Sequence, residues 1–534
     1  MRTLLIGIDA ACSRVLDPLF DAGVTPTLQG LFEDGVSGTL DSQIPPWTPS
    51  AWPSLYTGVN PGKHGAYSFL SFDGYDWDVI NRSNVAEYAL WELLDQQGFS
   101  SVVVNVPVTY PPSDVDGAIV PGYTAPEDPD CHPDGILSDV RAELGDYRVY
   151  GERSVDDPID EQLAEYLELT RMRGRAFRYL ADRFDPDFGF IQFQQTDTVF
   201  HEHPDDCDVV EGIYEAVDEE VAAILDAHDP DNVLVVSDHG IGEYDGYEFR
   251  VNEFLDERGF VERTAGDGGM PSWSSIARKE LQDGRDDGDP HPTALERSLS
   301  VAATFGLTSQ RLQAVVDRLG LTDFVLDRVS ADAVRAASEQ VDFARSTAYM
   351  RSRIELGVRI NLQGREPNGV VPPDEYDAVR DRLISALRSV ETPDGNPVFD
   401  AVVPRERLFD GDHVEDAPDV VTVPADFDNY LSASLRGEQF AAPSEAWNHK
   451  IDGTFAAAGD AVGDASPSGA HLFDVAPTVL ATMGVPASDR MDGATMPFVE
   501  PSGTTAYPAY DSDLDIATDD AAVEQQLTNL GYLE

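Results

Sequence analysis

The chain has 534 residues, 98 acidic and 36 basic, and a formal net charge of −62 at pH 7. Apolar residues make up 42% of it, which excludes wholesale disorder, and no apolar run approaches the roughly 18 residues of a membrane helix. Three widely spaced cysteines exclude a disulfide framework, and the first apolar run, residues 3–8, is short for a secretory signal, so we expect a soluble, cytoplasmic protein.

Short apolar runs predict buried strands at residues 4–9, 102–106, 188–193, 233–237, 358–362, 420–423 and 454–458. Between them, the spacing of apolar residues predicts helices at residues 84–97, 161–183, 209–228, 375–390 and 473–483. Strands that alternate with helices of this length predict an α/β fold with a doubly wound, largely parallel sheet and helices on both faces. In such folds the functional site lies at the carboxyl ends of the strands.

Residues 264–346 interrupt this alternation with a Gly/Asp-rich stretch and helical segments. We predict a helical insertion here, which is either a lid over the site or a surface elaboration. It would divide a catalytic core made of residues 1–263 and 347–499. Residues 500–534 are acidic and are predicted to form a C-terminal tail.

The basic residues are almost all arginine, with only three lysines, Lys63, Lys279 and Lys450. Replacement of lysine by carboxylates is typical of salt-in halophilic, chiefly archaeal, organisms, because a Debye length of roughly 3 Å at about 1 M salt removes the self-repulsion. The alternative is an ordinary acidic surface. No basic stripe is present to neutralise phosphates, which argues against binding of duplex nucleic acid.

Aspartate and histidine residues stand close to the ends of several predicted strands. In chain order they are Asp9, Asp197, His201, Asp238, His239 and His449. Most of these strand ends would meet at one sheet edge, so the side chains could converge there. Carboxylates and imidazoles without cysteine suit Zn²⁺ or Mn²⁺. Taken singly, a strand-end aspartate is also a common turn or cap residue, and an i, i+4 Asp–His pair can lie on a helix surface.

The segment 45–65 is rich in Pro, Gly, Trp and hydroxyl residues. Thr48 precedes an expected helix start, where backbone amides and the helix dipole favour a phosphoryl oxyanion. Its hydroxyl is a weak nucleophile until a metal lowers its pKa. The alternative is that Thr48 is the N-cap, with Pro49 as the first helical residue. For His64, a buried structural role is favoured over a role as a metal ligand.

Together these segments resemble the alkaline phosphatase superfamily, and within it the type I phosphodiesterase/nucleotide pyrophosphatase family. The resemblance covers about residues 1–260 and 350–495. The motifs that carry it, in family order, are Gly-Ile-Asp at 7–9, Thr-Pro-Ser-Ala-Trp at 48–52, His64-Gly65, Asp-x-x-x-His at 197–201, Ser-Asp-His-Gly at 237–240 and Asn448-His449.

The resemblance implies an alkaline-phosphatase-like fold and a site for two divalent ions, with zinc expected first and manganese as the alternative. It implies that Thr48 attacks a small phosphate ester, forms a phospho-threonine intermediate and is also coordinated to the second ion. Amides near Pro49 and Ser50 would then meet the equatorial oxygens. The ligands implied are Asp197, His201 and His449 for one ion, and Asp9, Asp238 and His239 for the other.

One feature departs from the family pattern. Nucleotide pyrophosphatases commonly have an asparagine shortly after the His-Gly step, but residues 66–69 are Ala-Tyr-Ser-Phe. Monoesterases of the superfamily use cations there, and Lys63 and Arg82 are the nearby candidates. A phosphodiesterase or pyrophosphatase is the leading interpretation. A phosphomonoesterase or phosphomutase of the same superfamily, or a non-catalytic binding protein, is the alternative, and no oligomeric state is predicted.

Overall fold

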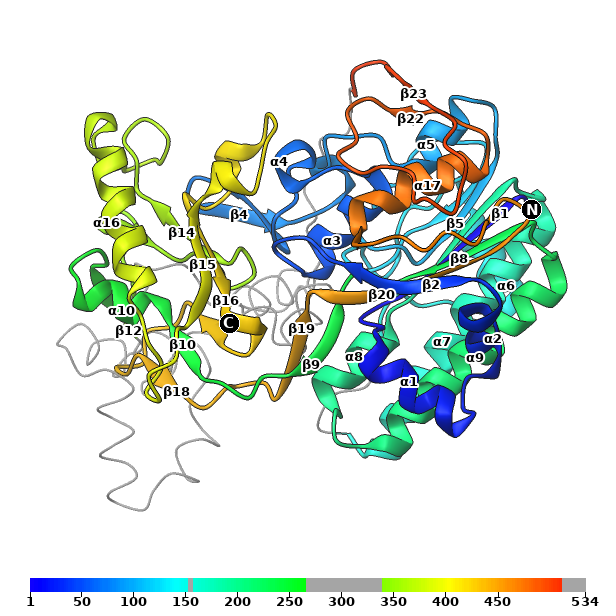
Figure 1. Cartoon of the computed structure of the whole chain (residues 1–534), viewed down its shortest axis with the longest axis horizontal. Coiled ribbons are helices and arrows are strands. Elements are labelled where there is room, and N and C mark those ends of the chain that lie inside the picture. The colour runs from blue at the N-terminus through cyan, green and yellow to red at the C-terminus, as the bar shows by residue number, and fades with distance from the viewer. Residues whose placement is uncertain (152–156, 266–338, 511–534) are drawn as a thin grey trace, which may run out of the picture.

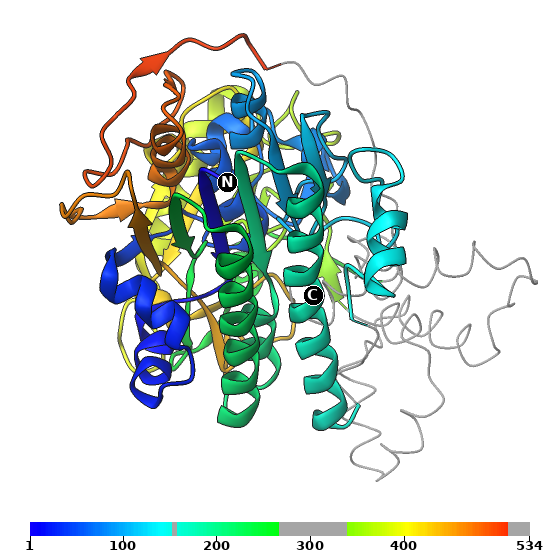
Figure 2. The ribbon, with the colours of Figure 1, turned by 90° about the vertical axis from the view of Figure 1, so that its right-hand side faces the viewer.

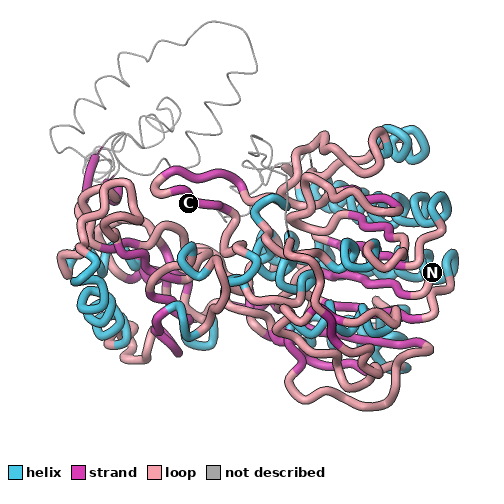
Figure 3. The backbone as a smooth tube through the Cα atoms, turned by 90° about the horizontal axis from the view of Figure 1, so that it is seen from above, coloured by secondary structure: helices cyan, strands magenta, loops and turns pink. Residues whose placement is uncertain are grey.

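The structure is a computed structural model that describes residues 1–151, 157–265 and 339–510. Figures 1 and 3 show a large layered part around β1 and β8, beside a smaller part that contains α16 and β14–β16. The predicted insertion at 264–346 lies almost wholly outside the described residues, as does most of the predicted tail at 500–534. The division of the chain into core, insertion and tail therefore stays a prediction.

The central sheet has eight strands, and its middle is parallel. From β8 to β6 all neighbouring strands run parallel, whereas β20 is antiparallel to both of its neighbours. The predicted doubly wound, largely parallel sheet is confirmed. The spatial order is β21 (Ala470–His471), β2 (Val36–Asp41), β20 (Asp452–Gly459), β8 (Asn232–Val236), β1 (Thr3–Ile8), β7 (Phe188–Phe193), β5 (Ser101–Val104) and β6 (Gly117–Val120).

Helices cover both faces of this sheet, and β1 shows why. Successive side chains of a strand point to opposite faces, and Leu4, Ile6 and Ile8 join one buried cluster while Leu5 joins another. The first cluster is covered by the helices α1 (Ser13–Ala22), α2 (Pro26–Asp34), α6 (Ile136–Leu144), α7 (Ile159–Phe184), α8 (Gln195–Glu202) and α9 (Cys207–His228). Of these, α7 and α9 lie side by side (Figure 2). The second cluster is covered by α3 (Thr48–Thr57), α5 (Leu90–Asp95) and α17 (Val475–Thr482).

The smaller part is built on an antiparallel sheet, which we call the small sheet. Its order is β13 (Ala348–Tyr349), β14 (Gly357–Ile360), β16 (Val420–Pro424) and β15 (Phe399–Pro404). Helix α16 (Tyr376–Arg388) packs on it through buried leucines. The strands predicted at 358–362 and 420–423 belong here and not to the central sheet, because an apolar run predicts a buried strand without specifying its partner.

Short strand pairs connect and flank these two parts. Among the described residues, no helix is both long enough and apolar enough to cross a membrane. In the described residues, the other strands and α-helices are β3 (Leu70–Asp73) with β4 (Asp76–Val79), β9 (Gly240–Glu243) with β19 (Trp447–Lys450), β10 (Glu248–Arg250) with β17 (Tyr430–Ser432) and β18 (Phe440–Ala441), β11 (Arg263–Ala265) with β12 (Glu339–Val341), β22 (Ala487–Ser488) with β23 (Thr504–Thr505), α4 (Pro61–His64) and α10 (Val251–Glu257).

Candidate active site

Three parallel strands of the central sheet end side by side, and each is followed by residues of the candidate site. Asp9 follows β1, while Asp238 and His239 follow β8. Helix α8 begins directly after β7 and carries Asp197 and His201. Because β1 lies between β7 and β8, the predicted convergence at the carboxyl edge is realised.

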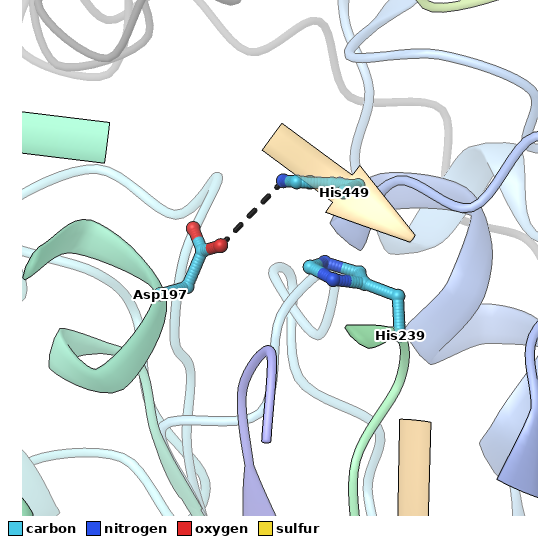
Figure 4. A group of neighbouring side chains, drawn as sticks. All are labelled: Asp197, His239 and His449. Carbon is cyan, nitrogen blue, oxygen red and sulfur yellow. Dashed lines mark ion pairs between the residues drawn. The ribbon is translucent and has the colours of Figure 1, made fainter. Parts of the chain in front are cut away.

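His449 reaches the same place from β19, outside the central sheet. Strand β19 pairs antiparallel with β9, which directly follows His239, and His449 lies opposite Ile241. The imidazole rings of His239 and His449 are stacked with their centroids 3.7 Å apart. Figure 4 shows the Asp197 carboxylate facing the ring of His449, with the His239 ring beside it.

The ligating atoms of the first predicted group lie within contact distance of one another. Asp197 Oδ1 is 3.3 Å from His201 Nε2 and 3.5 Å from His449 Nε2. The two histidine nitrogens are 3.1 Å apart. All three side chains are buried. A carboxylate and two imidazole nitrogens that meet in this way form a donor set of the kind that holds Zn²⁺.

The second predicted group is as tightly gathered. His239 Nε2 is 3.2 Å from Asp238 Oδ2 and 3.5 Å from Asp9 Oδ1. Ligand atoms of His239, Asp197 and His449 also lie within 4.8 Å of one another. His239 therefore lies close to both groups, whereas the resemblance assigned it only to the group with Asp9 and Asp238.

The six candidate ligands, Asp9, Asp197, His201, Asp238, His239 and His449, are called the cluster below. Neutral donors and a backbone carbonyl hold the outer atoms of Asp9 and His239, which point away from the other ligands. Asp9 Oδ2 accepts hydrogen bonds from Trp52 Nε1 at 3.1 Å and from Gln192 Nε2 at 2.7 Å. Nδ1 of His239 faces the Gly240 carbonyl at 3.0 Å. These contacts leave Asp9 Oδ1, Asp238 Oδ2 and His239 Nε2 buried and without a hydrogen-bond partner in the described part of the chain.

Burial disfavours the charged form of the carboxylates in the cluster. Burial, together with Asp238 and Asp197, raises the pKa of Asp9 well above its usual range. Burial likewise raises the pKa of Asp238 to about 6. For Asp197 burial is again the largest cause and acts in the same direction, but His201, His449 and His239 together outweigh it and lower the pKa of that carboxyl. Buried carboxylates with orphaned oxygens and imidazole nitrogens aimed at the same space fit a bound divalent cation.

Thr48 is the first residue of α3, and Trp47 occupies the N-cap position. The N-cap interpretation of Thr48 is therefore wrong, and its Oγ1 is buried with no hydrogen-bond partner among the described residues. Residues on both sides of it contact the cluster: the Pro46 carbonyl lies 2.9 Å from His449 Nδ1, and Trp52 bonds Asp9. The backbone before Thr48 and the helix after it are thus both attached to the cluster.

Two positions at the start of α3, Pro49 and Ser50, offer no free amide. Pro49 has no N–H, and the Ser50 amide donates to the Trp47 carbonyl at 2.9 Å. Neither Pro49 nor Ser50 itself therefore supplies an amide to phosphoryl oxygens, and a role for the amides beside them stays a prediction.

Comparison with known proteins identifies the family. A family model described as type I phosphodiesterase / nucleotide pyrophosphatase matches residues 3–450. The chain belongs to this family. It is a phosphoric ester hydrolase, as the sequence predicts. The superfamily is metal-dependent, and the cluster supplies candidate ligand groups. No curated protein matches the chain.

Two solved structures show the same fold. Phosphonoacetate hydrolase from Sinorhizobium meliloti 1021, in complex with phosphonoformate, is 15% identical with a TM-score of 0.51, and the match covers 89% of this chain and 94% of that one. Wild-type alkaline phosphatase PafA is 12% identical with a TM-score of 0.52, over 93% and 98% of the two chains. The predicted alkaline-phosphatase-like fold is confirmed.

Lys63 and Arg82 were the candidates from the sequence for the position of the family's asparagine. Both form ion pairs with other carboxylates in the structure. Lys63 pairs with Asp492. The Arg82 guanidinium is buried, pairs with Glu92 at 2.7 Å and donates to two backbone carbonyls. Sequence reasoning also missed Gln192, although a glutamine in the buried run 188–193 was a usable signal.

His64 lies in a hydrogen-bonded network that fixes α3, which agrees with the structural role favoured for it. Its Nδ1 accepts from the Ala66 amide at 3.0 Å, and its Nε2 lies 2.7 Å from Ser54 Oγ. Ser54 donates to Gln43, whose amide donates to Ser50 Oγ at 2.6 Å. The Ser50 hydroxyl returns to the Ala66 carbonyl at 2.7 Å. The network joins the segment before α3, its first turns and the His-Gly step.

Burial lowers the pKa of His64 from 6.5 to about 3. As the pH falls below 6.5 the unfolded chain takes up this proton first, so stability is lost between about pH 6.5 and pH 3. We expect His64→Gln to remove up to about 1.4 kcal/mol per pH unit from the pH slope of unfolding below that pH. Urea unfolding of both proteins between about pH 5 and 7 checks this, and equal slopes would contradict it.

Proposed function

We propose that this enzyme hydrolyses small phosphodiesters, pyrophosphates included, with Thr48 as nucleophile and two divalent ions, zinc first and manganese as the alternative. The observation that supports this most strongly is the gathering of six buried metal-ligand candidates, which Pro46 and Trp52, on either side of Thr48 in the chain, contact. One ion would be held by Asp197, His201 and His449, and the other by Asp9, Asp238, His239 and Thr48, with His239 placed between them. When bound, such ions lower the pKa of a hydroxyl and stabilise charge on phosphoryl oxygens.

The residues of the chain perform the remaining steps. Thr48 Oγ1 attacks phosphorus, an Oγ1–P bond forms, and the bond to the leaving alcohol oxygen breaks. The alcohol leaves with the proton that Thr48 gives up. Water then adds to phosphorus, the Oγ1–P bond breaks, the phosphate monoester is released and a proton from the water restores the Thr48 hydroxyl. Trp52 and Gln192 hold Asp9 by its outer oxygen, and the His64 network fixes the helix that carries Thr48. Both devices keep the reacting groups in place without reorganisation.

Charge favours a diester over a monoester. While Thr48 keeps its proton, three aspartates and two divalent ions give the site one net positive charge, which matches the single charge of a phosphodiester. A monoester carries up to two charges and calls for an additional cation, as in the monoesterases of the superfamily. Lys63 and Arg82 do not supply it, because each is paired elsewhere.

The test compares a bis-aryl phosphate diester with an aryl phosphate monoester in multimolar KCl with Zn²⁺ or Mn²⁺. We expect faster turnover of the diester, and a loss of about a thousandfold or more in Thr48→Ala with metal binding retained. Thr57→Ala is the matched control, because the Thr57 hydroxyl lies in the same helix and donates to its own helix carbonyl at Pro53.

The outcomes separate the alternatives. Preference for the monoester would place the enzyme with the phosphatases or mutases. Turnover that survives in Thr48→Ala would refute the nucleophile, and absence of turnover of both esters would favour a non-catalytic binding protein.

We also propose that the protein works at the high salt of a halophilic cytoplasm, on the strength of its net charge of −62 and its three lysines. Mutual repulsion of surface carboxylates should destabilise the fold in dilute buffer and vanish at short Debye lengths. We expect the midpoint of thermal unfolding to rise steeply from about 0.1 M to about 2 M KCl. An unchanged midpoint would indicate an ordinary acidic surface.

A further inference from the structure

The three histidines of the cluster share one orientation. Each turns Nε2 towards the carboxylates and Nδ1 away from them. For His239 and His449 the partner of Nδ1 is a backbone carbonyl, from Gly240 at 3.0 Å and from Pro46 at 2.9 Å. An acceptor at Nδ1 keeps the proton there and leaves Nε2 as the donor atom for a metal.

His201 differs, because a charged side chain takes the place of the carbonyl. Its Nδ1 lies 3.6 Å from Oε2 of Glu445. The same oxygen accepts a hydrogen bond from the Asn448 side chain, and Asn448 Oδ1 accepts from the His449 amide at 2.7 Å. Glu445 thus contacts two neighbouring parts of the candidate metal site at once.

The other oxygen of Glu445 is held by the smaller part of the molecule. Oε1 accepts from Arg353 Nη2 at 2.9 Å and from the Tyr430 hydroxyl at 3.1 Å. Arg353, in the connection between β13 and β14 of the small sheet, is 3% exposed and lies over the Tyr430 ring at 4.5 Å. A buried ion pair between a guanidinium and a carboxylate is costly to break, because removal of one partner leaves the other as an uncompensated charge.

We propose that Glu445 is the positioning residue of His201, and that Arg353 and Tyr430 hold it in place, so that retention of one metal ion depends on the small sheet. This inference rests on the proposed metal site and extends it. A carboxylate behind a ligating imidazole orients the ring and raises its basicity, and loss of such a partner typically costs about 10- to 100-fold in metal affinity. The central sheet alone would then hold this ion more weakly than the whole protein does.

The experiment measures the Zn²⁺ affinity of the metal-free, folded full-length chain by competition with a chromophoric chelator in multimolar KCl. We expect two binding steps in the wild type. Glu445→Gln should weaken one step by about 10- to 100-fold and leave the other unchanged. Arg353→Met should weaken the same step, and in a Glu445→Gln background it should have no further effect on that step, because it acts through Glu445.

Glu355→Gln is the matched control. Glu355 pairs with Arg351 in the same connection of the small sheet, and both side chains are as deeply buried as Arg353. Its removal should lower the stability of the fold and leave both zinc affinities unchanged. Circular dichroism selects variants that are folded, and Glu445→Asp, which keeps the carboxylate, should recover part of the lost affinity.

The results distinguish this inference from the proposed function. Two unchanged affinities in Glu445→Gln would overturn the positioning role and leave the metal site standing. Equal weakening by Glu355→Gln would also overturn it, because the effect would then be a general consequence of a damaged small sheet. A wild-type chain that binds no zinc would overturn both.

Discussion

Three carboxylates buried at one edge of the central sheet are the constraint on which the rest of the site depends. Asp9, Asp197 and Asp238 are all fully inaccessible to solvent. Like charges so close together in a medium of low dielectric repel strongly and lose their hydration. The protein surrounds them with an indole N–H, amide groups and imidazoles. Among these, His201 brings positive charge, because Asp197 and Glu445 outweigh burial and raise its pKa to about 10. Divalent cations are the partners that would balance this arrangement.

The scaffold holds the carboxylates in place through its most rigid elements. β1 is flanked on both sides by parallel strands, and the aspartates follow directly from the strand ends or from the helix after β7. The nucleophile candidate comes from a different layer, at the start of α3, whose entry is tied by the network around His64. The two halves of the chemistry are therefore positioned by separate parts of the core. Trp52 joins them, because it belongs to α3 and bonds Asp9.

Much of this was predictable from the sequence because the signals are local. Apolar runs that end in Asp or Asp-His predicted the strands β1 and β8 and the edge where they meet, and the long helices α7 and α9 lie within a few residues of their predicted bounds. The predicted helix at 84–97 is shorter in the structure, as α5 (Leu90–Asp95).

What escaped prediction depends on contacts between distant segments. The partners of β14 and β16 could not be read from apolar runs, since a buried antiparallel strand and a buried parallel one have similar sequences. The proximity of His239 to both ligand groups follows from the pairing of β9 with β19. Glu445 lies in an irregular segment among many other acidic residues, and its importance appears only when Arg353 and His201 are seen on either side of it.

The most direct test of the central claim is anomalous diffraction at the zinc absorption edge from crystals of the zinc-loaded protein. We expect two anomalous peaks: one among Asp197, His201 and His449, and one among Asp9, Asp238 and His239. The absence of peaks at this cluster, or zinc bound only elsewhere in the molecule, would contradict it.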